Sequence, residues 1–256
     1  GERGAQTAAG NLNGAGTAPI GPGYVDWLAS EGLSGGNGIV VQVQDDGIDQ
    51  GIATNLPGTA HADILGRIAG IFNATGDSLG DSRAGHGQIN AGIIMGNAAV
   101  GATDAAGFKL GQGMAPQASV YGTKIFLNDG PFDVGINTFT DLARNAQNAG
   151  ATFSSNSWGA PASGEYTSDS AEFDVLTRDS DPSEAGNQPM VYFFSAGNDG
   201  PSNGTLGSPG TAKNVITVGA GENSDADGTD GCGVPPSSSN SNRDIVDFSS
   251  RGPTDD

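Results

Sequence analysis

The stretch IVVQVQDDGID, residues 39–49, decides the predicted fold class. Its apolar part, residues 39–43, is typical of a buried strand, and this strand runs into an acidic turn at residues 45–49. Further short apolar runs predict strands at residues 119–126, 151–155, 190–195 and 214–218. Helical patterns accompany them at residues 24–33, 86–95, 134–149 and 168–178. Because strands that alternate with helices form parallel sheets, we predict an α/β fold with three layers: a mainly parallel central sheet with helices on both faces.

The chain is predicted to form one domain preceded by an arm. Residues 1–22 are rich in Gly, Ala, Asn and Thr and lack periodicity, so we predict an arm or loop there. Residues 23–256 then form the α/β domain. Within it, residues 221–242 are rich in Ser, Gly and Asp and are predicted to form an inserted surface loop. This loop contains the single cysteine, Cys232, so an internal disulfide is excluded.

Composition excludes several classes of partner. The 256 residues include 10 basic and 29 acidic side chains, which gives a formal net charge of −19. Nucleic acids and anionic membranes bind clusters of Lys and Arg, so neither is an expected partner. No apolar run approaches the roughly 18 residues that a membrane helix needs. The chain begins with Gly1 and carries no hydrophobic signal segment, and we interpret it as a processed, secreted protein, to which its acidity is suited.

Two acid–base candidates come from segments far apart in the sequence. Asp45 follows an apolar strand, and a carboxylate at the end of a strand can orient a histidine. His86 stands between Gly85 and Gly87 at the start of a predicted helix, where small neighbours let a substrate approach the imidazole. Histidine is the usual general base near neutral pH. The other histidine, His61, is interpreted as a surface or packing residue.

Two further strand ends offer polar or small residues. The segment NSWG, residues 156–159, ends one predicted strand, and AGN, residues 196–198, ends another. Gly197 permits close approach of the backbone, and Asn198 offers an amide donor for a developing oxyanion. The alternative is ordinary turns with a capping asparagine. Taken alone, these residues indicate only acyl transfer or hydrolysis.

Together the segments resemble the subtilisin-like serine proteases, the subtilases. The resemblance covers nearly the whole chain from about Tyr24 onward. It rests on VQVQDDGID, GHGQINAG, GMAPQA, NSWG, AGNDGP, SPGTAKNVITVGA and FSSRGPT, which occur in the order that the family has them. NSWGA, GTAKN and SSRGPT look nearest to the alkaline, oxidation-resistant branch that carries an additional C-terminal β-domain.

The resemblance implies a serine endopeptidase that hydrolyses peptide bonds in proteins. Asp45 would hold the imidazole of His86, His86 would take the proton of the nucleophile, and Asn198 would donate to the oxyanion. Two walls of the substrate pocket would be Ser157, Trp158 and Gly159 on one side and Ala196 and Gly197 on the other. Asp199 at the pocket mouth would favour basic side chains. No cofactor is expected for the chemistry.

A structural calcium ion is an open alternative at one loop. The segment DADGTDG, residues 225–231, gathers carboxylates, but its glycine spacing does not fit an EF-hand loop. We keep two interpretations of this loop, a solvated surface loop and a calcium site.

The sequence departs from the family pattern in its nucleophile. The serine of a subtilase follows the SSRGPT segment in a segment of the type GTSMA, and these 256 residues contain no such segment. Ser249 and Ser250 are not that serine. We therefore expect a peptidase domain truncated at its C-terminus, a C-terminal fragment or chain that carries the serine, and little activity from the isolated chain.

A second departure follows His86. The family favours Thr, any residue, then Val, whereas this chain has Gln88, Ile89 and Asn90. A buried Asn90 needs a hydrogen-bond partner, because an unpaired buried amide costs about 1–3 kcal/mol. Two other functions remain open on these grounds: a catalytically inactive pseudo-protease module that binds extended peptides, and a metal-dependent hydrolase that uses Asp45 and His86.

Overall fold

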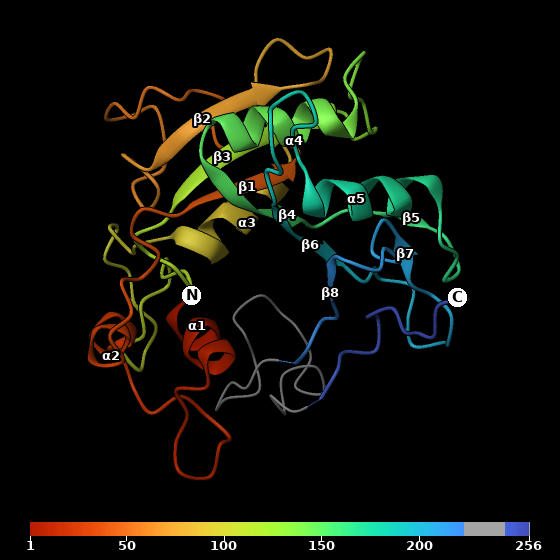
Figure 1. Ribbon diagram of the computed structural model, residues 1–256. Helices are drawn as coiled ribbons and strands as arrows, with labels where there is room; N and C mark the ends of the chain where they lie inside the picture. The colour runs from red at the N-terminus through yellow and green to blue at the C-terminus, as the bar shows by residue number, and fades with distance from the viewer. Residues whose placement is uncertain (223–243, 256) are drawn as a thin grey trace.

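The computed structural model describes residues 1–222 and 244–255, and within them a parallel sheet forms the centre of the molecule (Figure 1). The strand order of this six-stranded sheet is β2-β3-β1-β4-β6-β8, and all its pairs are parallel. The strands are β1 (Val40–Asp45), β2 (Ile68–Asn73), β3 (Ser119–Lys124), β4 (Ala151–Asn156), β6 (Val191–Ser195) and β8 (Ile216–Val218). A short antiparallel pair, β5 (Ala160–Pro161) with β7 (Gly207–Ser208), lies beside it. The α/β prediction is confirmed.

Helices cover both faces of the sheet, as predicted. On one face, α3 (His86–Met95) places Ala91 and Met95 against Val43 and Val120. On the other face, α4 (Phe139–Asn148) and α5 (Ser168–Arg178) pack on a second core cluster. The neighbouring β3 residues Val120 and Tyr121 belong to different clusters, because successive side chains of a strand point to opposite faces. Figure 1 shows the three layers.

Residues 1–22 were predicted to form an arm or loop, but the first part of this segment is helical. Residues Glu2–Ala9 form helix α1, which packs against α2 (Tyr24–Ser30). The buried carboxylate of Glu2 accepts hydrogen bonds from the backbone N–H groups of Gly23, Tyr24 and Lys109. These partners lie 21 or more residues away, so the local composition contained no sign of them.

Turn chemistry and close packing explain two other differences from the predicted elements. Helix α4 begins at Phe139 rather than residue 134, because Thr138 and Asp141 form a capping box that fixes its start. Strand β2 was not predicted. Its middle residue, Gly70, interrupts the apolar pattern, and a Cβ there would lie 2.8 Å from the ring of Tyr121. The bounds of α3 and α5 are those predicted.

Some predicted features lie outside the described residues. Cys232, the candidate calcium loop at residues 225–231 and most of the predicted surface loop at residues 221–242 fall there. No described helix is long and apolar enough to cross a membrane.

Candidate active site

A cavity of about 480 Å³ gathers the predicted site residues from the ends of several strands. Seven of the eight line it: Asp45, His86, Ser157, Trp158, Gly159, Gly197 and Asn198. The eighth, Ala196, is buried behind the wall, and its backbone bonds to Val218 and Gly207. Convergence at this edge follows from topology, because the carboxyl ends of parallel strands meet at one edge of a sheet.

Asp45 and His86 form the central contact of the site. The His86 Nδ1 atom lies 2.7 Å from Asp45 Oδ1. The carboxylate side chain is 2% exposed, whereas that of His86 is 58% exposed. With the imidazole N–H on Nδ1 donating to the carboxylate, Nε2 remains available as a base. The hydrogen bond with Asp45 raises the pKa of His86 above its ordinary value of 6.5; burial opposes this, and the charges of Asp45 and Asp46 reinforce it.

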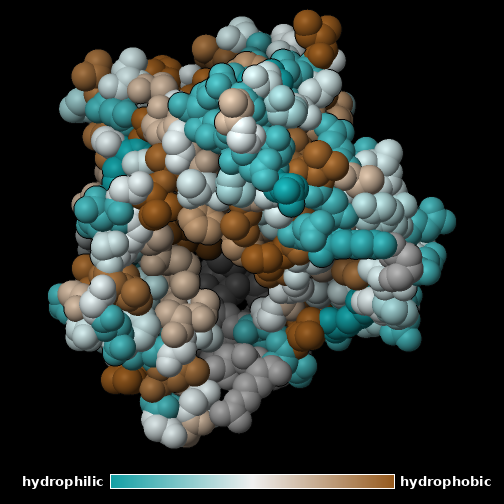
Figure 2. Space-filling view, viewed as in Figure 1, coloured by the Kyte–Doolittle hydropathy of each residue, from teal (hydrophilic) through white to brown (hydrophobic). Residues whose placement is uncertain are grey.

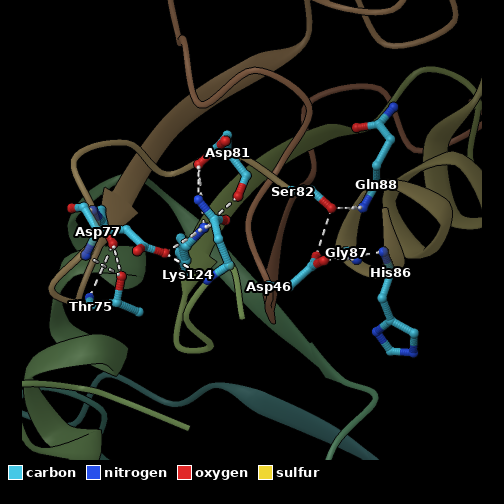
Figure 3. A network of polar contacts seen from close by, with 11 residues as sticks. Asp46, Thr75, Asp77, Asp81, Ser82, His86, Gly87, Gln88 and Lys124 are labelled. Atoms are coloured by element: carbon cyan, nitrogen blue, oxygen red, sulfur yellow. Dashed lines mark hydrogen bonds and ion pairs between the residues drawn. The ribbon is translucent and has the colours of Figure 1, made fainter. Parts of the chain in front are cut away.

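Asp46 fixes the start of α3, and so the place of His86. The first N–H groups of a helix have no partner within the helix, and the N-cap residue here is a glycine without a side chain. Asp46 replaces the missing cap: its carboxylate accepts from the backbone N–H groups of His86 (3.3 Å) and Gly87 (2.7 Å) and from the Ser82 hydroxyl (2.6 Å). Figure 3 shows these contacts converging on Asp46.

Gly87 is required by this close approach. A Cβ at Gly87 would lie 2.2 Å from the Gly47 carbonyl oxygen and 3.0 Å from the Cβ of Asp45. The helix therefore begins in direct contact with the turn that follows β1. The glycine that follows the histidine in the sequence therefore has a packing cause here.

A buried lysine holds the loop that leads to Ser82. The side chain of Lys124 is 0% exposed, and its Nζ atom lies 2.6 Å from the Asp81 carbonyl oxygen, 2.6 Å from Asn128 Oδ1 and 3.2 Å from Asp77 Oδ2. Lys124 pairs with Asp45 in the register of β3 with β1. Figure 3 shows this ammonium group between Asp77 and Asp81. The lysine thus joins the loop at residues 77–82 to the strands that carry the site.

The segment that carries Asn198 is held by its backbone. Gly197 has φ +105°, a conformation that favours glycine, and a Cβ there would lie 2.8 Å from Ser250 Oγ. Ser250 donates its backbone N–H to the Gly197 carbonyl, and its hydroxyl accepts from the Asp199 N–H at 3.1 Å. Asn198 itself is exposed, and its side-chain amide has no hydrogen-bond partner among the described residues. That amide is therefore free to meet a ligand in the cavity.

The wall formed by residues 157–159 is anchored in the core. The Trp158 ring stacks on Phe139 with centroids 5.7 Å apart and meets Phe194 edge to face at 5.3 Å. Beside it, the Ser157 hydroxyl donates to Asn90 Oδ1 at 3.2 Å. The aromatic packing fixes the wall, so the pocket is preformed on this side.

Sequence reasoning missed several residues of the site. Asn90 was expected only to need a partner; its amide donates to Asp45 Oδ2 at 3.0 Å and accepts from Ser157, and its nitrogen also lies 3.4 Å from His86 Nδ1. The position of Asn90 four residues after His86 was the available signal, because such residues share a helix face. The cavity lining that sequence reasoning did not assign comprises Asp46, Ala84, Phe126, Leu127, Gly130, Ala160, Pro161, Ser195 and Gly207.

Two other cavities lie away from this cleft, on the exposed flank of α3. They measure about 280 and 310 Å³, and both are lined by Ile93 and by Gly1. His61 lines the first of them and does not line the candidate active site. In the space-filling view, hydrophobic residues border a hollow near the middle of the displayed face (Figure 2).

Comparison with known proteins gives a matching family, a related sequence and a related fold. The subtilase family model (Peptidase_S8) matches residues 36–256. Serine protease AprX of Bacillus subtilis (strain 168) is 29% identical over 227 residues, which are 86% of this chain and 44% of AprX. The solved structure of the S41 psychrophilic protease superposes with a TM-score of 0.56 at 23% identity, over 88% of this chain and 64% of that one, and shows the shared fold.

The chain therefore belongs to the subtilase family. It spans less than half the length of AprX and about two thirds of the length of the psychrophilic protease.

Proposed function

We propose that this chain supplies the acid–base and oxyanion groups of a serine endopeptidase. The observation that carries the proposal is the hydrogen bond that an exposed His86 donates to the buried Asp45, in a cavity that also contains the Asn198 amide, which has no partner among the described residues. A buried carboxylate behind an accessible imidazole is the arrangement that a general base needs, because it fixes the tautomer and stabilises the imidazolium.

In the proposed reaction, His86 Nε2 removes a proton from a serine hydroxyl as its oxygen attacks the peptide carbonyl carbon. Asn198 donates to the carbonyl oxygen as it becomes an oxyanion. His86 then gives the proton to the leaving amine, and the C–N bond breaks to leave an acyl-enzyme. Water then attacks the acyl carbon while His86 takes its proton. His86 returns this proton to the serine oxygen as the ester C–O bond breaks, and the acyl group leaves as a carboxylic acid.

The nucleophilic serine belongs to the proposal as a residue outside this sequence. The His86 imidazole has Asp45 and Asn90 as its hydrogen-bonding neighbours in residues 1–222 and 244–255, and no hydroxyl bonds to it there. A C-terminal segment or fragment that carries the serine is therefore the proposed partner, and the isolated chain is predicted to have almost no activity.

The proposed substrates are proteins or peptides that bind in extended form. The cavity runs between the wall at residues 157–159 and the segment at residues 126–130, and Asp199 lies at its edge. The charge of Asp199 favours basic side chains near that edge. Secretion and the presence of an additional C-terminal β-domain are further elements of the proposal, supported by acidity and by sequence resemblance respectively.

A structural calcium ion is proposed without an assigned site. The described residues contain no group of three or more His, Cys, Asp or Glu side chains placed to hold a metal ion. The candidate loop at residues 225–231 lies outside them. No metal is proposed for the chemistry, so a chelator should act through stability, slowly, rather than abolish cleavage at once.

The experiment uses the complete gene product that contains this chain. Casein hydrolysis is measured with and without a serine-directed covalent inhibitor, and the labelled residue is located by mass spectrometry. Cleavage that stops on labelling of one serine supports the proposal. Failure of both cleavage and labelling contradicts it, and peptide binding without turnover would establish the inactive binding module instead.

A further inference from the structure

Asn90 connects Asp45 to the pocket wall at residues 157–159. Its side-chain N–H donates to Asp45 Oδ2 at 3.0 Å, and its side-chain oxygen accepts from the Ser157 hydroxyl at 3.2 Å. Asp45 ends β1 and Ser157 follows β4, two strands that are paired in the sheet. One amide on α3 therefore ties the buried carboxylate to the first residue of the pocket wall.

The carboxylate of Asp45 is fully engaged in this arrangement. Its Oδ1 atom accepts from the Asp46 backbone N–H at 2.8 Å and from His86 Nδ1 at 2.7 Å. Its Oδ2 atom accepts from Asn90. Because each oxygen has its own donors, rotation of the carboxylate about the Cβ–Cγ bond would break at least two of these three hydrogen bonds. Asn90 supplies the only one of these restraints that acts on Oδ2 within the described residues.

We propose that Asn90 is a positioning residue that orients Asp45 toward His86 and couples this pair to the pocket wall at Ser157. The inference deepens the proposed peptidase function, on which its catalytic consequence rests. The family pattern that the sequence resembles has an apolar valine at this place, and a valine side chain could make neither of these hydrogen bonds.

The proposal predicts a shift in the titration of His86. The Asn90 amide offsets part of the negative charge of Asp45, so its removal leaves a carboxylate that attracts the imidazolium more strongly. The titratable groups that face His86 are Asp45 and Asp46, with Asp199 across the cavity, and α3 carries no other charged residue. Loss of Asn90 therefore raises the pKa of His86 and moves the acid limb of kcat/KM to higher pH.

The test compares three variants in the complete gene product. Asn90→Val removes both hydrogen bonds and installs the residue that the family pattern has. Asn90→Asp keeps the size of the side chain but places a second carboxylate against Asp45. Asn148→Val makes the same change as the first at an exposed position at the end of α4, and serves as the matched control.

Two readouts are measured for each variant. Steady-state kinetics on a peptide substrate gives kcat and KM, and NMR of histidines labelled with ¹⁵N gives the titration of His86. His86 and His61 are assigned by the loss of their signals in the variants His86→Gln and His61→Gln. His61 lines another cavity and serves as an internal reference.

For Asn90→Val we expect kcat to fall about tenfold with KM changed less than about twofold, as fits the loss of one hydrogen bond to a charged group. The His86 titration should move to higher pH, while His61 stays in place. Asn90→Asp should move it further in the same direction, because it adds a negative charge. Asn148→Val should leave both readouts as in the unaltered protein.

An unchanged His86 titration in Asn90→Val overturns the proposal, including the case in which the variant is only less stable. The NMR measurement separates this inference from the proposed function. If the unaltered gene product cleaves and labels nothing, the peptidase assignment fails, while the titration of His86 in Asn90→Val still decides whether Asn90 acts on the pair of Asp45 and His86.

Discussion

Strands β1 and β6 end at the same cavity, but the residues that follow them are held in different ways. At the end of β1, Asp45 and Asp46 are buried, and their carboxylates accept six hydrogen bonds from the backbone and from side chains. After β6, Asn198 is exposed, and its segment is held through the backbone of Gly197 and the hydroxyl of Ser250.

This difference fits the two chemical roles that we propose for these residues. A general base must keep one tautomer and one direction throughout the reaction, so its carboxylate partner is fixed by many donors. An oxyanion donor must remain unpaired until charge develops on the substrate, so the protein holds its backbone and leaves its amide free. Substitutions near β1 should therefore affect stability and activity together, whereas substitutions at Asn198 should affect activity alone.

The largest expected effect comes from removal of the base. His86→Ala in the complete gene product should lower kcat by about 10⁶-fold, a magnitude known for this family rather than one that follows from the geometry. Substrate binding should persist, because the pocket wall is anchored by Trp158 in the aromatic core. Single-turnover kinetics measures the loss. His61→Ala is the control, and equal loss in both variants would contradict the assignment of His86.

The second largest expected effect tests the region after β6, where Asn198 is exposed. Asn198→Ala should lower kcat by about 10²–10³-fold, again a magnitude known for the family, with little change in KM. Thermal denaturation should be unchanged, because the side chain is exposed and makes no hydrogen bond with the described residues. Asn203→Ala, an exposed position in the following segment, is the control. A fall in melting temperature with kcat preserved would show that Asn198 has a structural role.

The third prediction tests whether the residues at the end of β1 depend on the loop that Lys124 holds. Lys124→Met should lower the free energy of unfolding by about 3 kcal/mol, because it leaves Asp77 and Asp81 without their buried cation. It should also lower kcat, since the loop at residues 77–82 carries the Ser82 that bonds to Asp46. Urea denaturation and kinetics are measured beside Lys109→Met, an exposed lysine. Lower stability with normal kcat would separate this loop from the site.

The same contrast explains how much the sequence could predict. The sequence could predict that Asp45, His86 and Asn198 meet, because each follows or begins a regular element and the ends of parallel strands lie at one edge of the sheet. The helices α3 and α5 were predicted to the residue because their starts are marked locally, by a glycine and by Thr167.

Residues that act through distant partners could not be predicted. Lys124 follows an ordinary strand pattern, and nothing within its neighbourhood in the sequence indicates that Asp77, Asp81 and Asn128 surround its ammonium group. Glu2 is comparable, since its partners lie at residues 23, 24 and 109. Such side chains satisfy buried charges only after the chain has folded, so composition and periodicity carry no sign of them.

The smallest expected effect concerns pH, and it has opposite signs for activity and stability. The pKa of His86 is raised above 6.5 by its hydrogen bond with Asp45. A base must be neutral, so kcat/KM should rise with pH and reach half of its maximum above pH 6.5.

Stability should change in the opposite direction. The ion pair between the His86 imidazolium and Asp45 stabilises the fold fully below the pKa that His86 has in the unfolded chain. This contribution disappears as pH rises through the pKa that His86 has in the folded protein. The difference in melting temperature between the unaltered protein and His86→Gln should therefore shrink from about pH 5 to pH 9, over the range in which activity increases. A difference that is constant with pH would mean that the imidazolium gains nothing from Asp45 in the folded protein.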